Sequence, residues 1–353
     1  MKRQEAYWLN LFKDEVPMLN MPTDYKRPPI QSTEGDLVQF EIDSDLSANL
    51  KKMAKEHGVT LYMLLLAGYT ALLSKYTGQE DIVVGSPIAG RPHDDLKDVI
   101  GMFVNTLAMR NYPKGDKSFC DYLTEVKETA LKAYENQDYP FDELVEKLDL
   151  TRDMSRSALF DTMFVMQNFD HDEFEMKDLT FAPYEMEAHV SKFDLTLTAI
   201  EEDQKIKCVL NYGTKLFKKE TMERLAKHLI HIFQAIIDQP ERSLHDISML
   251  SEEETERLLY EFNDTKAYYP KDKTISQLFE EQVKRTPHHV AIKFEDKKLT
   301  YLELNEQANQ LARLLQDKGA KQGDNSRNNG GSIPRDDHWN DGRIKNGSCL
   351  FAN

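Results

Sequence analysis

The sequence predicts an α/β fold. Apolar runs of strand length alternate with amphipathic stretches of helix length, and Gly, Pro, Asp and Asn mark the turns between them. One apolar strand-like run, DIVVGSPIAGRP, lies between two helical patterns, an order that is typical of a sheet layered with helices. A hydrophobic content of 40% in 353 residues is enough to build a core.

The first predicted elements are two helices and a buried strand. A helix is expected from Asp45 to His57, capped by Ser44 or Asp45 and closed by Gly58. A strongly apolar helix, TLYMLLLAGYTALLSKYTG, follows it. DIVVGSPIAGRP then reads as a buried strand that runs into a Gly/Pro loop.

The middle of the chain continues the alternation of strand and helix. GMFVNTLAMR is expected to be a strand and SFCDYLTEVKETALKAYENQ a helix. FDELVEKLDL predicts a short helix that starts after Pro140, and LFDTMFVMQNF another apolar strand. FDLTLTAIEE and KIKCVLNYG flank a polar turn at Asp203 and Gln204, which indicates a hairpin. A long amphipathic helix, Lys218 to Asp238, ends before Pro240.

A domain boundary is expected after this helix. The chain is charged and irregular from Glu241 to Lys273, around one helical stretch, SEEETERLLYEFND. Beyond it, HVAIKFEDKKLTY predicts a small hairpin and LELNEQANQLARLLQDKG a helix. These last elements are few, and they are marginal as an independent core.

Charge and cysteine content exclude several classes of protein. The chain has 45 basic and 61 acidic residues, a net charge of −16, so nucleic acid and anionic membrane are poor partners. Three widely separated cysteines, Cys120, Cys208 and Cys349, indicate neither a disulfide framework nor a zinc site, and a reducing cytoplasm is expected. The sequence shows no signal peptide pattern and no apolar run of membrane-spanning length.

Four strings occur in a fixed order: VGSPIAGR, IGMFVNTLAMR, NQDYPFDEL and RDMSRSALFDTMF. Together they resemble the later core motifs of the condensation domain of nonribosomal peptide synthetases, of the surfactin, lichenysin and fengycin type. LTYLELNEQANQLARLL resembles the first core motif of an adenylation domain. The residues that match the condensation motifs are Gly101, Phe103, Val104, Asn105, Thr106, Gln137, Asp138, Pro140, Phe141, Arg152, Asp153, Ser155 and Arg156.

The resemblance implies both a fold and an activity. It implies one half of a pair of chloramphenicol-acetyltransferase-like units, a mixed sheet flanked by helices, followed by a small α+β stub of an adenylation domain. In the family, phosphopantetheine thioesters on two carrier domains enter a tunnel, and the acceptor amine attacks the donor thioester. Such a reaction needs orientation of the amine and removal of its proton. No cofactor is expected to be bound covalently in this chain.

The catalytic motif of that family, HHxxxDG, does not occur in this sequence. We expect it upstream of Met1, in an N-terminal half, so the chain would be a C-terminal half that is inactive alone. His288 and His289 are the only adjacent histidines, and a surface turn explains them better. His228 and His231 lie three residues apart on one helix face, but no third metal ligand is near them in sequence.

Two residues have both a functional and a structural interpretation. Arg110 ends an apolar strand and could pair with the aspartate of the missing motif, or be a surface arginine. Asn168 could line the tunnel, or be an ordinary strand-end asparagine. The strings also have structural interpretations: Asp138 caps a helix that Pro140 starts, Gly85 and Gly90 allow a tight turn, and RDMSRS suits an exposed loop.

The end of the chain lacks the pattern of the rest. From Asp324 it is rich in Asn, Gly and scattered charge, without hydrophobic period. Permitted codons can be chosen for Ser326 onward so that the same bases, read one position displaced, encode a different amino-acid string. That string has the pattern of a strand, a helix and a loop, and it resembles the second adenylation motif. We therefore predict a frame shift near codons 325 and 326; a natively disordered tail is the alternative.

The predicted organisation is a condensation domain part at 1–250, a linker at 251–273, an adenylation stub at 274–325 and a frame-shifted tail at 326–353. The predicted function is that of a fragment of an elongation module, which forms peptide bonds between carrier-bound amino acids. Its partners would be peptidyl carrier domains and the N-terminal half. Two alternatives are a noncatalytic module that binds carrier domains and an acyltransferase subunit completed by a separately encoded N-terminal half.

Overall fold

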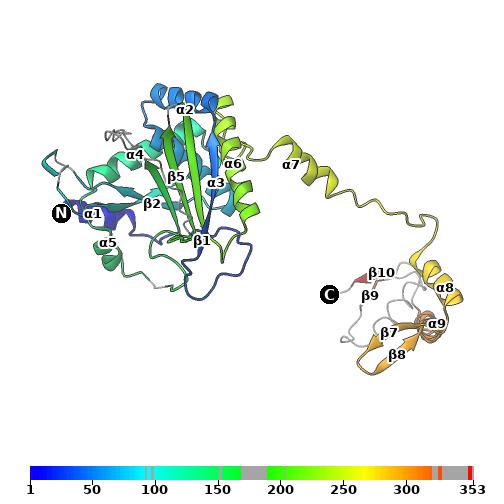
Figure 1. Ribbon diagram of the computed structural model, residues 1–353. Helices are drawn as coiled ribbons and strands as arrows, with labels where there is room; N and C mark the ends of the chain where they lie inside the picture. The colour runs from blue at the N-terminus through cyan, green and yellow to red at the C-terminus, as the bar shows by residue number, and fades with distance from the viewer. Residues whose placement is uncertain are drawn as a thin grey trace, which may run out of the picture. The chain divides into compact units, whose positions relative to one another are not determined.

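The computed structural model describes residues 1–91, 94–96, 99–150, 153–167, 189–202, 204–319, 325–327 and 349–351. The chain forms two compact units, Met1–Asn263 and Asp264–Asn353. Figure 1 draws the elements of both units along the chain.

The first unit is built around a six-stranded sheet. Its strands are β1 (Gly35–Ile42), β2 (Ile82–Ile88), β3 (Asn105–Asn111), β4 (Thr162–Gln167), β5 (Leu195–Glu202) and β6 (Lys205–Gly213). The strand order is β1-β6-β5-β4-β2-β3. Strand β4 is parallel to β2 and to β5, and the other pairs are antiparallel, so the sheet is mixed as predicted.

Helices α2, α3, α4 and α6 pack against this sheet (Figure 1). The helical segments of the unit are α1 (Lys2–Leu11), α2 (Ser44–Glu56), α3 (Leu61–Thr77), η1 (Asp94–Leu96), α4 (Phe119–Glu135), α5 (Phe141–Lys147), α6 (Lys219–Asp238), α7 (Glu252–Glu256) and the π-helical turn η2 (Arg257–Glu261). Helix α3 is the centre of the core, because eleven consecutive residues from Met63 to Leu73 are buried. Its apolar sequence therefore reflects burial on all sides rather than an amphipathic surface.

The ends of the helices follow local chemistry. Thr60 and Ser118 accept hydrogen bonds from backbone N–H groups in the first turns of α3 and α4, and Gly78 closes α3 in the left-handed conformation, with φ 68°. The cap of α2 is Asp43, whose carboxylate accepts a 2.9 Å hydrogen bond from Leu46 N, rather than the predicted Ser44 or Asp45. Three neighbouring residues are good caps, and sequence alone does not choose between them.

Strand β3 is shorter than predicted. Its pairing with β2 runs from Asn111 to Asn105, opposite Ile88, and Gly101 to Val104 lie outside it. Gly90 has φ 63°, and a Cβ there would approach Phe103 O to 1.8 Å, so the chain turns out of the sheet at a position that requires glycine. The predicted turn at Gly85 is wrong, because Gly85 lies within β2, where the Phe160 ring occupies the place of a side chain.

The second unit contains few elements. It has α8 (Ile275–Arg285), the antiparallel pair β7 (Val290–Phe294) and β8 (Lys297–Thr300), α9 (Tyr301–Asp317), and the parallel pair β9 (Asn325–Arg327) and β10 (Cys349–Phe351). Capping boxes at Thr274 and Thr300 start its two helices. His288 and His289 lie in an exposed turn, as predicted.

Candidate functional site

The predicted site residue Arg110 lies on β3 with only 5% of its surface exposed. Its guanidinium forms a bidentate ion pair with Asp81, with Nε to Oδ1 at 3.0 Å and Nη2 to Oδ2 at 2.7 Å. It also donates to the backbone oxygens of Leu11 at 2.9 Å and Glu15 at 3.0 Å. The interpretation as a surface arginine is therefore wrong. The hydrogen bond to Asp81 raises the pKa of Arg110, against the opposing effect of burial.

Asn105 joins two of the sequence motifs. Its amide nitrogen donates to Gln137 O at 2.8 Å and to Tyr139 O at 2.9 Å, while its Oδ1 accepts from Phe141 N at 3.2 Å. One side chain thus satisfies three backbone groups of the NQDYPFDEL string. Pro140 is the N-cap residue of α5 rather than its first helical residue.

Asp138, which was predicted to cap that helix, instead accepts a 3.0 Å hydrogen bond from Gln4 on α1. The NQDYPFDEL string is therefore connected by a hydrogen bond to α1, just before the start of α5. Thr106 follows Asn105 on β3 and pairs with Pro87 of β2.

Residues 99–104, directly before β3, present apolar side chains to solvent. Ile100 and Met102 are almost fully exposed, at 100% and 94%, and Val104 is exposed as well. Phe103 is half-buried, and the Arg91 guanidinium lies 4.3 Å from its ring centroid. Arg91 also donates to Gly101 O at 3.2 Å. Arg91 therefore contacts the backbone of residues 99–104, while Ile100, Met102 and Val104 have no cover among the described residues.

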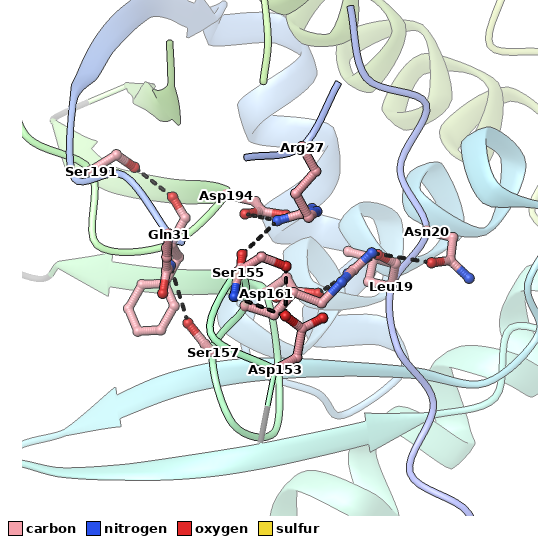
Figure 2. Close-up of polar contacts among 12 residues, drawn as sticks. Leu19, Asn20, Arg27, Gln31, Asp153, Ser155, Ser157, Asp161, Ser191 and Asp194 are labelled. Carbon is pink, nitrogen blue, oxygen red and sulfur yellow. Dashed lines mark hydrogen bonds and ion pairs between the residues drawn. The ribbon is translucent and has the colours of Figure 1, made fainter. Parts of the chain in front are cut away.

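The RDMSRS string takes part in a network of two arginines and three aspartates (Figure 2). Arg27 pairs with Asp194 and donates to Ser155 O at 3.1 Å, and Arg156 pairs with Asp161. Asp153 accepts from both the backbone N and the hydroxyl of Ser155.

The prediction of an exposed loop holds for Asp153 and Met154 of the RDMSRS string, which are exposed, and is wrong for Ser155, which is buried. Arg156 of the string pairs with the buried Asp161, which lies outside it. Arg152, also in the motif, lies outside the described residues.

Burial and pairing compete within this network. Burial raises the pKa of Asp161, and the neighbouring Asp194 carboxylate adds to the rise, while Arg156 opposes it. Two hydrogen bonds from Ser155 lower the pKa of Asp153. Because the Asp161 carboxylate is both buried and close to another carboxylate, its charge depends on the two arginines.

Asp161 and Asp194 were not predicted as site residues, although a local sequence pattern marks both. Each follows a phenylalanine and stands directly before a strand, in Phe160–Asp161 before β4 and Phe193–Asp194 before β5. Parallel neighbouring strands begin at the same edge of a sheet, and Thr162 pairs with Leu195. A repeated Phe-Asp pair before two strands therefore predicts that the two carboxylates meet.

Within the described residues, the strand β4 presents alternate side chains to the helix α3 and to the opposite face of the sheet. Thr162 and Phe164 face α3, since Tyr69 OH contacts Thr162 Oγ1 at 2.6 Å and the Tyr69 and Phe164 rings lie 6.2 Å apart. The alternate residues Met163, Val165 and Gln167 point to the other face and are half-buried. Asn168, predicted to lie in a tunnel, follows Gln167 and is outside the described residues.

The described residues hold no group of three or more His, Cys, Asp or Glu side chains arranged for a metal ion. Each ring nitrogen of His228 has a protein partner: Tyr76 OH at 2.7 Å and Glu254 Oε2 at 2.9 Å. In the part of the chain that the structure describes, no single helix is long and apolar enough to span a membrane. Helices α2 and α3 reach that length only as a pair bent by 108°.

Solved structures share this fold. A four-domain nonribosomal peptide synthetase bound to AMP and glycine matches 98% of this chain over 27% of its own length, with a TM-score of 0.78 and 23% identity. The X-domain from teicoplanin biosynthesis matches 70% of this chain over 57% of its own, with a TM-score of 0.63 and 24% identity. The condensation domain of the monacolin K polyketide synthase matches 69% over 58% of its own, with a TM-score of 0.58 and 18% identity. The fold is therefore that of condensation domains, and the predicted fold class is confirmed.

The family follows from sequence. The condensation domain model matches residues 1–259, and the AMP-binding enzyme model matches residues 279–325. The chain belongs to the condensation domain family of nonribosomal peptide synthetases.

Curated relatives agree with this assignment. Bacitracin synthase 3 of Bacillus licheniformis is 65% identical over 319 residues, and gramicidin S synthase 2 of Brevibacillus brevis is 54% identical over 320 residues. Each alignment covers 90% of this chain, which spans only 5% and 7% of the two relatives.

Proposed function

We propose that the chain is the C-terminal half of a condensation domain of an elongation module, followed by a linker and the start of an adenylation domain. The parent activity is peptide bond formation between amino acids carried on phosphopantetheine. The boundaries are those predicted from sequence: 1–250, 251–273 and 274–325. The chain would act with peptidyl carrier domains and with an N-terminal half that bears HHxxxDG.

The observation that carries this proposal is the combination of a family match over residues 1–259 with a sequence that lacks HHxxxDG. The extent of the fold match supports it, since 70% and 69% of this chain correspond to only 57% of the teicoplanin X-domain chain and 58% of the monacolin K condensation domain chain. The exposed apolar side chains of Ile100, Met102 and Val104 also support it, because a second protein surface would remove them from water.

In the proposed reaction the acceptor amine nitrogen attacks the carbonyl carbon of the donor thioester. A C–N bond forms, the C–S bond breaks, the phosphopantetheine thiol leaves, and the nitrogen loses one proton. The phosphopantetheine arms arrive as parts of the substrates on partner carriers. The histidine that accepts or orients the proton would come from the other half, since no HHxxxDG is present here.

We assign supporting roles to Arg110 and Asn168. The Arg110 side chain makes contacts with Asp81, Leu11 and Glu15, and it would pair in addition with the motif aspartate of the N-terminal half. Asn168 follows Gln167, the last residue of β4, and it would hydrogen-bond the acyl or amine group in the tunnel.

We also propose that residues 326–353 are translated out of frame. The AMP-binding match ends at residue 325, which supports this boundary. The segment from 328 to 348 lies outside the described residues.

The test of the split domain is binding. A polypeptide with the HHxxxDG half of a bacterial condensation domain is titrated with this chain by calorimetry. We expect saturable association, which an Ile100→Asp/Met102→Asp variant abolishes. The control is Leu131→Asp, an apolar position on α4 that is 47% exposed, which should bind like the wild type. If neither the wild type nor the control binds the other half, the split-domain proposal is wrong.

A further inference from the structure

The two histidines of α6 contact the start of the linker rather than a metal. His228 is 3% exposed, and its Nε2 lies 2.9 Å from Glu254 Oε2 on α7, while its Nδ1 lies 2.7 Å from Tyr76 OH on α3. One turn later, His231 Nδ1 lies 3.2 Å from Met249 O. The two histidines therefore contact the segment that follows α6 at Met249 and at Glu254, five residues apart.

The proton positions follow from the partners. A carboxylate accepts hydrogen bonds, so Nε2 of His228 carries a proton and donates it to Glu254. With that proton on Nε2, Nδ1 can accept from the Tyr76 hydroxyl. Burial raises the pKa of Tyr76 to about 12, so this hydroxyl keeps its proton. His231 donates from Nδ1 to the Met249 carbonyl, which can only accept.

Apolar packing ends just before this segment. Leu244 and Ile247 are buried, but α7 has no buried residue, and Leu258 and Phe262 beyond it are exposed. The Ser251 cap of α7 is local to the helix and does not join it to the rest of the unit. Met249 still packs against the core, so it is beyond Met249 that the contact of His228 with Glu254 holds the chain where apolar burial no longer does.

We propose that His228 and His231 form a clasp that fixes the point at which the linker leaves the first unit. With the clasp closed, the chain is held as far as α7. With the clasp open, it is free beyond Met249, which gives the linker more length. This conformational device is independent of the catalytic role proposed above.

The test is hydrogen exchange on the full chain, with Glu254→Ala as the variant. Glu253→Ala is the matched control, because Glu253 is on the same helix, is 86% exposed and contacts only Arg257 of its own helix among the ion pairs described, at 3.6 Å. The amides of Thr255 and Arg257 report on the helix, since they bond to Ser251 O and to Glu253 O.

We expect both amides to exchange about tenfold faster in Glu254→Ala, the effect of losing one hydrogen bond to a charged group, and to be unchanged in Glu253→Ala. Glu254→Gln keeps an acceptor for His228 Nε2–H and should retain most of the protection. Amides of α6 serve as the internal reference for intact folding. Equal acceleration in both alanine variants, or none in either, would show that the histidines do not hold the linker.

Discussion

Replacement of the two motif arginines, Arg156 and Arg110, should lower the free energy of unfolding by different amounts, because their carboxylate partners differ in exposure. The side chain of Asp161 is 5% exposed, and its Oδ1 has no hydrogen bond partner among the described residues. Arg156→Met would leave a buried charge without its pair and Leu19 O without a donor. Breaking a buried pair in this way costs about 3–5 kcal/mol.

Arg110→Met should be milder. The side chain of Asp81 is 34% exposed, so water can replace the lost partner of its carboxylate. The main loss is then the hydrogen bonds to Leu11 O and Glu15 O, about 1 kcal/mol each. We therefore expect the free energy of unfolding to fall by about 2 kcal/mol, less than for Arg156→Met.

The assay is urea denaturation followed by Trp8 fluorescence, in a Trp339→Phe background so that the first unit alone is observed. Trp8 is buried and donates to Asn136 O, so it reports unfolding of that unit. Asp161→Asn added to Arg156→Met should restore part of the loss, because it removes the unpaired charge. If Arg156→Met costs no more than Arg110→Met, exposure of the carboxylate does not decide the cost.

The same carboxylate gives a pH dependence. Since the pKa of Asp161 is raised in the folded state, the folded chain binds this proton more tightly than the unfolded chain. The contribution of Asp161 to the unfolding free energy therefore decreases as pH rises through its folded pKa. Asp161→Asn should remove this part of the pH profile between acid and neutral pH.

Three further predictions concern the Cys120 thiol, Asn105 of the site and the tail. Burial raises the pKa of the Cys120 thiol to about 11, so its alkylation rate should rise about tenfold per pH unit up to that value, and a plateau near pH 8.5 would contradict it. Asn105→Ala removes three hydrogen bonds to backbone groups and should cost about 2–3 kcal/mol in the same urea assay, whereas an unchanged midpoint would deny that it joins the motifs. Sequencing of the locus should show that the bases of codon 326 onward encode an adenylation strand and helix in the neighbouring frame; any other continuation rejects the frame shift.

Local sequence predicted the elements but not the long-range polar contacts. Helix α3 was predictable because an apolar run of its length, with Thr60 before it and Gly78 after it, leaves few alternatives. The pair of Arg27 with Asp194 joins residues 167 apart in sequence, and no local pattern specifies such a partner. Only the repeated Phe-Asp before β4 and β5 offered a clue, through the geometry of parallel strands.

The error at β3 has a similar origin. Gly101 to Val104 are apolar and read as part of a strand, yet the chain leaves the sheet at Gly90 and returns only at Asn105. An apolar pattern indicates that side chains will be covered, and it does not say by which chain. The proposed N-terminal half would supply that cover.

The most direct test of the proposed function is dipeptide formation from two loaded carrier proteins, measured by mass spectrometry. The chain alone should yield no dipeptide above the uncatalysed background, and addition of the HHxxxDG half should yield product that disappears when the second histidine of that motif is replaced by alanine. Dipeptide formed by the chain alone, or a bound pair of halves that forms none, would contradict the proposal that this chain is the C-terminal half of a condensation catalyst.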